Sequence, residues 1–419
     1  MTFFESEGRT AAALAGPTPS PRPVRAPDLV KDDAQALDVA KRLADEFAPD
    51  AALRDRKRRL PWAELDAFVL SGLWGITVPR AYGGADVSNG VLAEVTAIIS
   101  AADGSLGQIP QNHYYALEVL RVGGSHAQKR FFYERVLAGE RFGNALAEIG
   151  NKDFKRRTRL TRAPGDWHID GQKFYCTGAL YAHWIPTLVV ADDDGRDVTY
   201  LVFVPRAAQG VSVTDDWDGF GQRVTGSGSV RFDHVAVQPE WVIPSQTSFD
   251  RPTTIGPLAQ IIHAAIDLGQ ARGAFEASLP FIRERSRPWI DAKVARASDD
   301  PLTIAQVGDL AVRLRAAEAL VRRAGRAVDA AQAEPTERSV AQASIAVAEA
   351  RALTTTASLD AGSRLFELAG TAATLDGLGL DRFWRNARTH TLHDPVRWKY
   401  HAIGNFYLNE KLPPRHGAL

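Results

Sequence analysis

The spacing of hydrophobic residues changes twice along this 419-residue chain, and this change limits its fold more than any other feature. Apolar residues recur at helical spacing over about 32–143, alternate at period two over about 144–245, and return to helical spacing over 246–419. Helices and sheets each need a partner surface to cover their apolar face. The sequence therefore predicts an α+β protein with a helical domain, a β-domain and a second helical domain at those positions, after a flexible tail at 1–31.

The middle stretch contains short, closely spaced strand signals. Trp167–Ile169 and Lys173–Tyr175 flank the dipeptide Asp170-Gly171, which suits the positive φ angles of a tight turn, so we expect a β-hairpin here. Further alternating segments lie at 188–190 and 198–204. Strands of this length and spacing favour a compact β-barrel or sandwich.

The C-terminal stretch is rich in alanine and has long helical periodicity. We predict helices at Pro257–Arg285, Pro301–Ala333 and Thr336–Ala369. Their apolar faces are wider than a lone monomer needs. We therefore expect a helical bundle that also forms a subunit interface.

The composition argues against several classes of protein. Lys+Arg and Asp+Glu each number 50, so no net charge attracts the chain to nucleic acid or to anionic membranes. The single cysteine, Cys176, excludes an intrachain disulfide and a cysteine-rich zinc site. The sequence lacks the run of about 18 apolar residues that a membrane helix needs. Residues 1–26 lack the basic start and apolar core of a signal peptide, so we expect a cytoplasmic protein.

The sequence also lacks three common nucleotide and hydrolase motifs. No Gly-x-Gly-x-x-Gly follows a predicted strand, and neither Gly-x-x-x-x-Gly-Lys-Ser/Thr nor Gly-x-Ser-x-Gly occurs. We therefore do not expect a nicotinamide-binding Rossmann unit, a phosphate-binding P-loop or a serine hydrolase.

The densest polar cluster lies at Arg382–Pro395. If this segment is helical, His390 and His393 share a face at i,i+3, and Asp394 follows at the helix end. Two imidazoles and a carboxylate can bind a metal, can be satisfied by hydrogen bonds at an interface, or can exchange protons in an active site. No third metal ligand is recognisable elsewhere in the sequence, so we expect no metal site.

Several segments resemble hallmarks of the acyl-CoA dehydrogenase superfamily and follow its order. They are Val78–Gly84, the flavin-contacting segment Gly171–Thr177, and Gly221–Val237, which closes the β-domain. By this resemblance Tyr175 would pack on the isoalloxazine of a flavin and Thr177 would lie near flavin N5. The resemblance also implies the superfamily's fold, with an N-terminal helical domain, a middle β-barrel or sandwich and a C-terminal four-helix bundle that assembles as a homotetramer.

The position of the dehydrogenase base departs from that pattern. The superfamily's Tyr-Glu-Gly-Thr motif aligns with His393–Val396, so the shorter Asp394 stands where dehydrogenases carry glutamate. The segments Ala101–Gly107 and Arg382–Pro395 instead resemble the flavin-dependent monooxygenase branch of the dibenzothiophene and sulfur-acquisition type. That resemblance implies molecular oxygen as a substrate and reduced flavin as cofactor, more in keeping with FMN than with FAD. It also implies a separate flavin reductase, because the sequence shows no nicotinamide site.

The same resemblance assigns catalytic roles to the histidine cluster. His390 and His393 would face the oxygen-reactive edge of the flavin, where a C4a-hydroperoxide forms. His393 would hydrogen-bond that peroxide, and His390 would protonate the departing oxygen or hold His393 in its tautomer. Asp394 would orient a histidine rather than act as a base.

The remaining site residues also come from the resemblance. Asn144 and Thr177 would line the flavin pocket, and Arg287 would meet the flavin phosphate. The substrate pocket would include Gln108, Asn112 and His113, because Gln108 and Asn112 replace a histidine and a tyrosine of the dibenzothiophene enzyme. This difference favours a small sulfide or sulfone, of the kind that the sulfur-acquisition enzymes oxygenate, over a polycyclic aromatic substrate.

Two other functions remain compatible with these residues. One is an acyl-CoA dehydrogenase or related flavin oxidoreductase in which Asp394 is the base. The other is a non-catalytic flavin-binding protein on the same scaffold.

Overall fold

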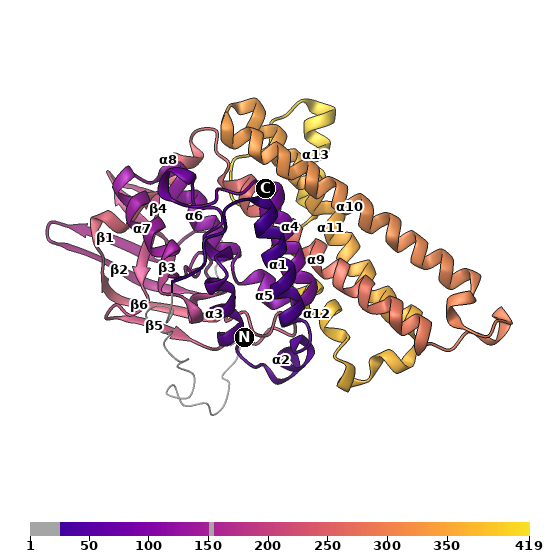
Figure 1. Ribbon diagram of the computed structural model, residues 1–419. Coiled ribbons are helices and arrows are strands. Elements are labelled where there is room, and N and C mark those ends of the chain that lie inside the picture. The colour runs from indigo at the N-terminus through magenta and orange to yellow at the C-terminus, as the bar shows by residue number, and fades with distance from the viewer. Residues whose placement is uncertain (1–25, 151–154) are drawn as a thin grey trace. The chain divides into compact units, whose positions relative to one another are not determined.

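The computed structural model describes residues 26–150 and 155–419, and it confirms the predicted order of helices, strands and helices. Residues 1–25 of the predicted tail lie outside the described residues. The chain divides into two compact units, each described here by itself (Figure 1). The β-unit comprises 140–218 and 226–246, and the helical unit comprises 26–139, 219–225 and 247–419.

The β-unit contains one sheet of seven strands among the described residues, in the order β5-β6-β2-β1-β3-β4-β7. Alternate residues such as Ile169, Val202 and Val235 are buried in its core because successive side chains of a strand point to opposite faces. The strands are β1 (Arg159–Ala163), β2 (Asp166–Lys173), β3 (Trp184–Asp193), β4 (Arg196–Pro205), β5 (Val211–Thr214), β6 (Ser229–Ala236) and β7 (Val242–Pro244).

The predicted hairpin turn at Asp170-Gly171 is wrong, because β2 runs through both residues. The turn lies between β1 and β2, where Gly165 has a φ of +77°. Asp170 instead lies at a bulge, where the register of β2 against β6 shifts between Ile169 and Gly171. A Cβ at Gly171 would lie 2.7 Å from the Thr158 Cα, so this glycine allows close approach of the backbone rather than a chain reversal.

The helical unit draws on both ends of the chain. The α-helices are α1 (Asp33–Phe47), α2 (Ala51–Lys57), α3 (Trp62–Leu70), α4 (Asn89–Ala102), α5 (Gly104–Gln108), α6 (Gln111–Gly123), α7 (His126–Leu137), α8 (Gln246–Phe249), α9 (Ile255–Glu284), α10 (Pro301–Ala333), α11 (Glu337–Ala369), α12 (Asp381–His390) and α13 (Arg397–Asn409). Helices α9, α10 and α11 pack against one another, and α4 packs against α9 and α10 (Figure 1). The N-terminal and C-terminal helices therefore share one core.

The start of α10 shows why the long helices were predictable. The Asp300 side chain accepts a hydrogen bond from the Leu302 N–H, which caps the helix, and Pro301 occupies its first turn. The helix ends at Ala333, as its periodicity predicts.

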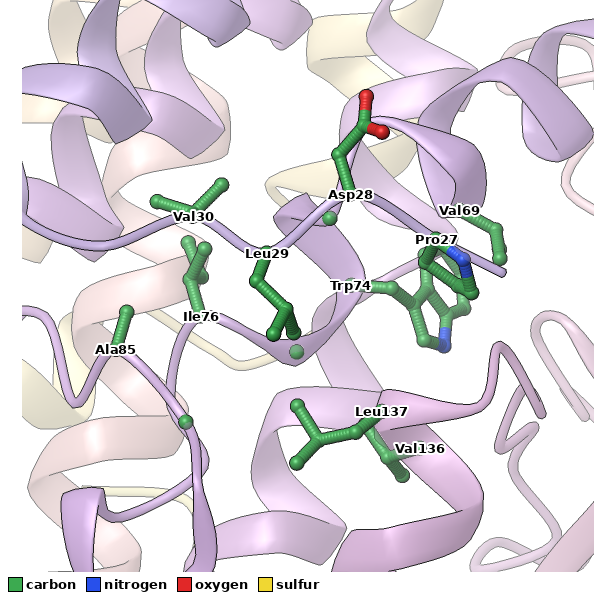
Figure 2. Close-up of a pocket in the computed structure, with 13 residues that line it drawn as sticks. Pro27, Asp28, Leu29, Val30, Val69, Trp74, Ile76, Ala85, Val136 and Leu137 are labelled. Carbon is green, nitrogen blue, oxygen red and sulfur yellow. The ribbon is translucent and has the colours of Figure 1, made fainter. Parts of the chain in front are cut away.

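A small pocket forms where the segment Pro27–Val30 crosses the helical unit beside Trp74 and Leu137 (Figure 2). Its lining is mainly apolar, and the Asp28 carboxylate points away from Leu137. The segment fits closely, because a Cβ at Gly72 would lie 2.2 Å from the Asp28 carbonyl oxygen. The pocket therefore results from packing and brings no acid–base groups together.

Within the described ranges, none of the helices has the length and apolar character needed to cross a membrane.

Candidate active site

The histidine cluster lies around the end of α12, which stops at His390. The helix cannot continue through Pro395, because proline has no N–H and disfavours helical backbone at the preceding residue. His393 therefore lies in the turn beyond α12, and the prediction that both histidines share one helical face is wrong. Their ring centroids are 6.5 Å apart, with a third imidazole nearby.

His390 is fully buried and held at both ring nitrogens. Its Nδ1 lies 2.5 Å from Oδ1 of Asp267, and its Nε2 lies 2.9 Å from Nδ1 of His263. Because the Asp267 carboxylate can only accept, His390 Nδ1 carries the proton of that bond. His390 Nε2 and His263 Nδ1 therefore share one proton between them.

The third imidazole, His263, was not predicted from the sequence. It lies on α9, and its ring centroid is 4.0 Å from that of His393 and 5.1 Å from that of His390. It is fully buried, and burial together with the neighbouring His393 and His390 lowers its pKa well below the usual value. His263 is therefore neutral near pH 7 and can both accept and donate a proton.

Asp267 forms the buried anchor of this group. Arg351 forms an ion pair with it, and the Thr355 hydroxyl donates to its Oδ2 at 3.2 Å. Burial alone would raise the pKa of the Asp267 carboxyl, but Arg351 and His390 outweigh burial and hold it below its usual range. Burial lowers the pKa of His390 despite this carboxylate. The site thus holds an ionised aspartate beside a neutral imidazole.

The Asp394 carboxylate is hydrogen-bonded to two neighbours, and Lys399 lies behind one of them. His393 Nδ1 lies 3.2 Å from Asp394 Oδ2, and the Gln260 amide donates to the same oxygen at 2.9 Å. Lys399 donates to Gln260 Oε1 at 3.0 Å and to the Ala418 carbonyl.

The charges around Asp394 favour its ionised form. Burial alone would raise the pKa of its carboxyl, but His393, Lys399 and Gln260 together hold it far below its usual range. Burial in turn lowers the pKa of Lys399 to about 8. A carboxylate stabilised in this way is a weak base, so the geometry favours an orienting role toward His393.

The sequence does contain a signal for the α9 residues that were missed. Gln260, His263, Asp267 and Gln270 are polar residues in the buried and mainly apolar N-terminal part of α9, and all four are buried. Their spacing of three or four residues places them on one face of α9. A polar stripe in a core helix indicates a site, because buried polar groups need partners.

Among the described residues, one set in this cluster has metal-ligand geometry. His263, His393 and Asp394 each offer a ligand atom, and these atoms lie within 4.8 Å of one another. In the same arrangement His263 Nδ1 bonds His390 and Asp394 Oδ2 bonds Gln260. These two groups therefore already have hydrogen-bond partners within the cluster.

The predicted substrate residues lie on α5 and α6, and all are buried. Gln108 Oε1 has no hydrogen-bond partner, and neither the nitrogen nor the oxygen of the Gln270 amide has one. His113 Nε2 bonds the Trp74 carbonyl at 2.9 Å, and burial lowers the pKa of His113 to about 3. His113 is thus a core imidazole beside Trp74, whereas Gln108 and Gln270 keep unused polar atoms. Asn112 is buried on the first turn of α6.

The predicted flavin residues of the β-unit lie together. The Asn144 amide donates to the Tyr175 carbonyl at 3.3 Å, and the Thr177 and Ser227 hydroxyls are 2.7 Å apart. Tyr175 has a φ of +61° and is 46% exposed, with its ring against Trp217. A positive φ is unusual for an aromatic residue and is often found at binding sites.

Arg287 lies apart from the histidines within the helical unit. It is exposed and follows the end of α9 at Glu284. Because His263 is 21 residues before that end, the helix separates the two by roughly 30 Å at 1.5 Å per residue.

The residues of each unit, taken by itself, suit part of a flavin. An exposed tyrosine ring and a hydroxyl pair in the β-unit suit a planar ring with polar edges. The Gln108 oxygen and the Gln270 amide, which have no hydrogen-bond partner, offer further polar atoms in the helical unit. An exposed guanidinium such as Arg287 suits a phosphate.

Comparison with known proteins agrees with this chemistry. Family models of the acyl-CoA dehydrogenase N-terminal, middle and C-terminal domains match residues 31–140, 150–235 and 261–398. A dibenzothiophene monooxygenase of Rhodococcus erythropolis is 32% identical over 412 residues, covering 94% of this chain and 98% of the relative. A probable FMNH2-dependent monooxygenase, SfnC, of Pseudomonas putida is also 32% identical, covering 90% of this chain and 96% of the relative.

A solved structure shows the same similarity in three dimensions. FMN-bound TdsC from Paenibacillus sp. A11-2 superimposes with a TM-score of 0.88 at 33% identity, covering 92% of this chain and 100% of TdsC. Sequence and structure thus lead to the same group of proteins.

Proposed function

This chain belongs to the acyl-CoA dehydrogenase family, in its flavin-dependent monooxygenase branch, and we propose that it oxygenates a small organic sulfide or sulfone. The main observation behind this assignment is how Asp394 is hydrogen-bonded and how its pKa is shifted. Its carboxylate is bound to His393 and Gln260 and its pKa is held far below the usual range, so it is a weak base for removing a proton from carbon. The imidazoles of His263, His390 and His393 provide proton donors and acceptors in its place.

The cofactor is a flavin, and reduced FMN supplies the electrons for oxygen activation when it is bound. Support comes from the FMN-bound relative and from the FMNH2-dependent relative. By the same comparison a separate reductase delivers the reduced flavin and oxygen is the second substrate. Such a supply is available in the cytoplasm, which we propose as the location.

His393 is the proposed catalytic proton donor. With its Nδ1 directed at Asp394, its Nε2 is the atom left to hold or deliver a proton. Its side chain is 45% exposed, so this edge can meet a ligand, whereas His390 and His263 are buried. Asp394 stabilises the protonated ring, as an orienting carboxylate does in other acid–base sites.

His263 and His390 act as positioning residues behind His393. His390 is fixed by Asp267, and it fixes His263, whose ring lies against that of His393. Both buried imidazoles are neutral near pH 7, because burial lowers their pKa values. Their role is to orient the His393 ring.

The substrate size is the first point to test. Gln108 and Gln270 place polar amide atoms in the helical core, which suits a compact polar group such as a sulfone oxygen better than a polycyclic ring. We expect turnover of dialkyl sulfides or sulfones to exceed that of dibenzothiophene by roughly tenfold or more. The measurement mixes the protein with photoreduced FMN under argon, adds oxygen, and quantifies oxygenated product and hydrogen peroxide.

Two outcomes would contradict this assignment. Faster oxygenation of dibenzothiophene than of the alkyl compounds would refute the proposed substrate size while keeping the monooxygenase. Reduction of oxidised flavin by an acyl-CoA, without oxygenation of any sulfur compound, would favour the dehydrogenase reading with Asp394 as base. No reaction of either kind would favour a non-catalytic flavin-binding protein.

We further propose that the chain works as a homotetramer, with each flavin held by residues of two subunits. A separation of roughly 30 Å along α9 is longer than a flavin mononucleotide, so Arg287 and His263 of one subunit cannot hold the same flavin. Exposed apolar side chains also lie on α10, at Leu302, Ile304 and Val312. Such side chains favour an interface.

Light scattering should give about four times the 45.6 kDa chain mass at micromolar concentration. A sharper test co-expresses two defective variants, Arg287→Ala and His393→Ala. If the sites are shared, mixed oligomers contain some sites with Arg287 of one subunit and His393 of the other, so activity returns. A monomer mass, or the absence of any complementation in mixed oligomers, would refute the shared site.

A further inference from the structure

A second group of histidines and carboxylates lies in the β-unit, where β2 pairs with β6. His168 and Asp170 lie on β2 and His234 lies on β6, while Asp166 begins β2. The register shift at Asp170 brings His234 across from it. The Asp170 carboxylate accepts a hydrogen bond from the backbone N–H of His234 at 2.8 Å. His234 has a φ of +47°, which is rare for a histidine within a strand.

The bulge stacks the two imidazoles between two carboxylates. The ring centroids of His168 and His234 are 3.8 Å apart with 35° between the ring planes. Asp166 Oδ1 lies 3.0 Å from His168 Nδ1 and 3.9 Å from His234 Nε2. Asp170 Oδ2 lies 3.3 Å from His168 Nε2 and 4.0 Å from His234 Nδ1.

The contacts of His168 outnumber the N–H groups of a neutral imidazole. A neutral imidazole has one N–H, yet both nitrogens of His168 face a carboxylate oxygen. One nitrogen of a neutral His168 would therefore direct its lone pair at an anionic oxygen. Either a proton on that nitrogen or a metal ion bound to it would remove this repulsion.

One divalent metal ion could be bound by Asp166 together with the ring nitrogens of His168 and His234 that face it. The ligand atoms of Asp166, His168 and His234 lie within 4.8 Å of one another. In a tetrahedral zinc site, bonds of ~2.0–2.2 Å place ligand atoms about 3.3 Å apart, so the ligand atoms would move inward and the stacked rings would tilt toward the ion. The other nitrogen of each ring is then free to carry a proton toward Asp170.

We propose that Asp166, His168 and His234 form a binding site for a first-row divalent cation such as Zn2+, with Asp170 orienting both imidazoles. Two imidazoles and one carboxylate select such ions over Mg2+ and Ca2+, which prefer oxygen ligands. A carboxylate that accepts the second N–H of a ligating histidine is a common feature of zinc sites. Three protein ligands leave a fourth position for water, and the ion would fasten β2 to β6 at the bulge.

The test uses the full-length chain without an affinity tag, stripped with a chelator and titrated with Zn2+ by calorimetry. The site variant is His234→Asn, because asparagine tolerates a positive φ and removes the imidazole without straining the bulge. It should weaken binding by at least ~100-fold, whereas Asp170→Asn should weaken it by ~10–100-fold. The Co2+-substituted protein should show the visible absorption of a tetrahedral site, and His234→Asn should lose it.

The control variant is His393→Ala, which removes a ligand atom from the other candidate set and should leave this zinc site unchanged. Zn2+ binding of equal affinity in wild type and His234→Asn would overturn the proposal. So would the failure of the stripped wild-type protein to bind Zn2+ at micromolar concentration, since the cluster would then hold protons alone. Loss of binding only in His393→Ala would place the metal in the active-site cluster and would also overturn it.

Discussion

Replacing His393 with alanine should leave binding of reduced FMN intact but lower the oxygenated product by about 100–1000-fold. The reason is that His393 is the half-exposed imidazole of the cluster and its Nε2 is available to a ligand. Without this donor, oxygen consumed at the flavin should leave as hydrogen peroxide. The measurement is the ratio of product to peroxide in a single turnover with photoreduced FMN.

Asp394→Asn should cost less, by ~10–100-fold, because Asp394 orients His393 and does not touch the reacting atoms in this mechanism. His401→Ala is a matched control, since His401 is an exposed histidine on α13 outside the cluster. If His393→Ala kept full coupling while Asp394→Asn abolished turnover, the carboxylate would be the essential base. The dehydrogenase assignment would then replace the one proposed here.

The elements that could be predicted from the sequence are those whose signals are local. The helix Pro301–Ala333 was predicted to the residue, because Asp300 caps it, Pro301 suits its first turn and its periodicity is unbroken. The β-strand at Asp166–Lys173 was not, since the Asp170-Gly171 dipeptide carries a turn signal that the partner strand β6 overrides. Pairing with a distant strand decides the conformation there, and the dipeptide alone does not record it.

The active-site residues also differ in whether their signal is local in the sequence. His390, His393 and Asp394 stand close together in the sequence, and the structure brings all three into one cluster. His263 and Asp267 lie more than 120 residues before their partner His390, so the polar stripe of α9 can be seen in the sequence but its partner is identified only by the packing of α9 against α12. A helix periodicity scan records Asp267 as one polar residue in an apolar stretch and cannot name its partner.

The second prediction with a large expected effect is that replacing Asp267 lowers the free energy of unfolding. Its carboxylate has no exposed surface, and it binds Arg351, His390 and Thr355. Arg351 is itself almost fully buried, so Asp267→Asn would leave a guanidinium charge in the core without its counter-ion. Breaking a buried pair from one side costs about 3–5 kcal/mol. We expect that loss in the free energy of unfolding at pH 7.

The free energy of unfolding of the wild-type protein should also fall as the pH is lowered. The Asp267 carboxyl has a lowered pKa, so its contribution is present above the pKa of about 3.9 in the unfolded chain and is lost as the pH falls toward the folded value. Buried His263 and His113 also have lowered pKa values. Below about pH 6.5 these imidazoles therefore bind protons in the unfolded chain but not in the folded chain. Both effects destabilise the protein in acid. His113 alone should contribute ~2 kcal/mol between pH 8 and pH 5, because its folded pKa is about 3.

Urea unfolding at pH 8 and pH 5 isolates the histidine contribution, because the Asp267 carboxyl loses its charge only below about pH 3.9. The control for Asp267→Asn is Thr355→Val, which removes one hydrogen bond to the same carboxylate and should cost only about 1 kcal/mol. The acid destabilisation that arises from His113 should persist in both variants, since His113 bonds the Trp74 carbonyl rather than Asp267. If Asp267→Asn were as stable as Thr355→Val, the Arg351 charge would have found another partner in the core. Asp267 would then not be the anchor of the histidine cluster, and the positioning role assigned to His390 would fail with it.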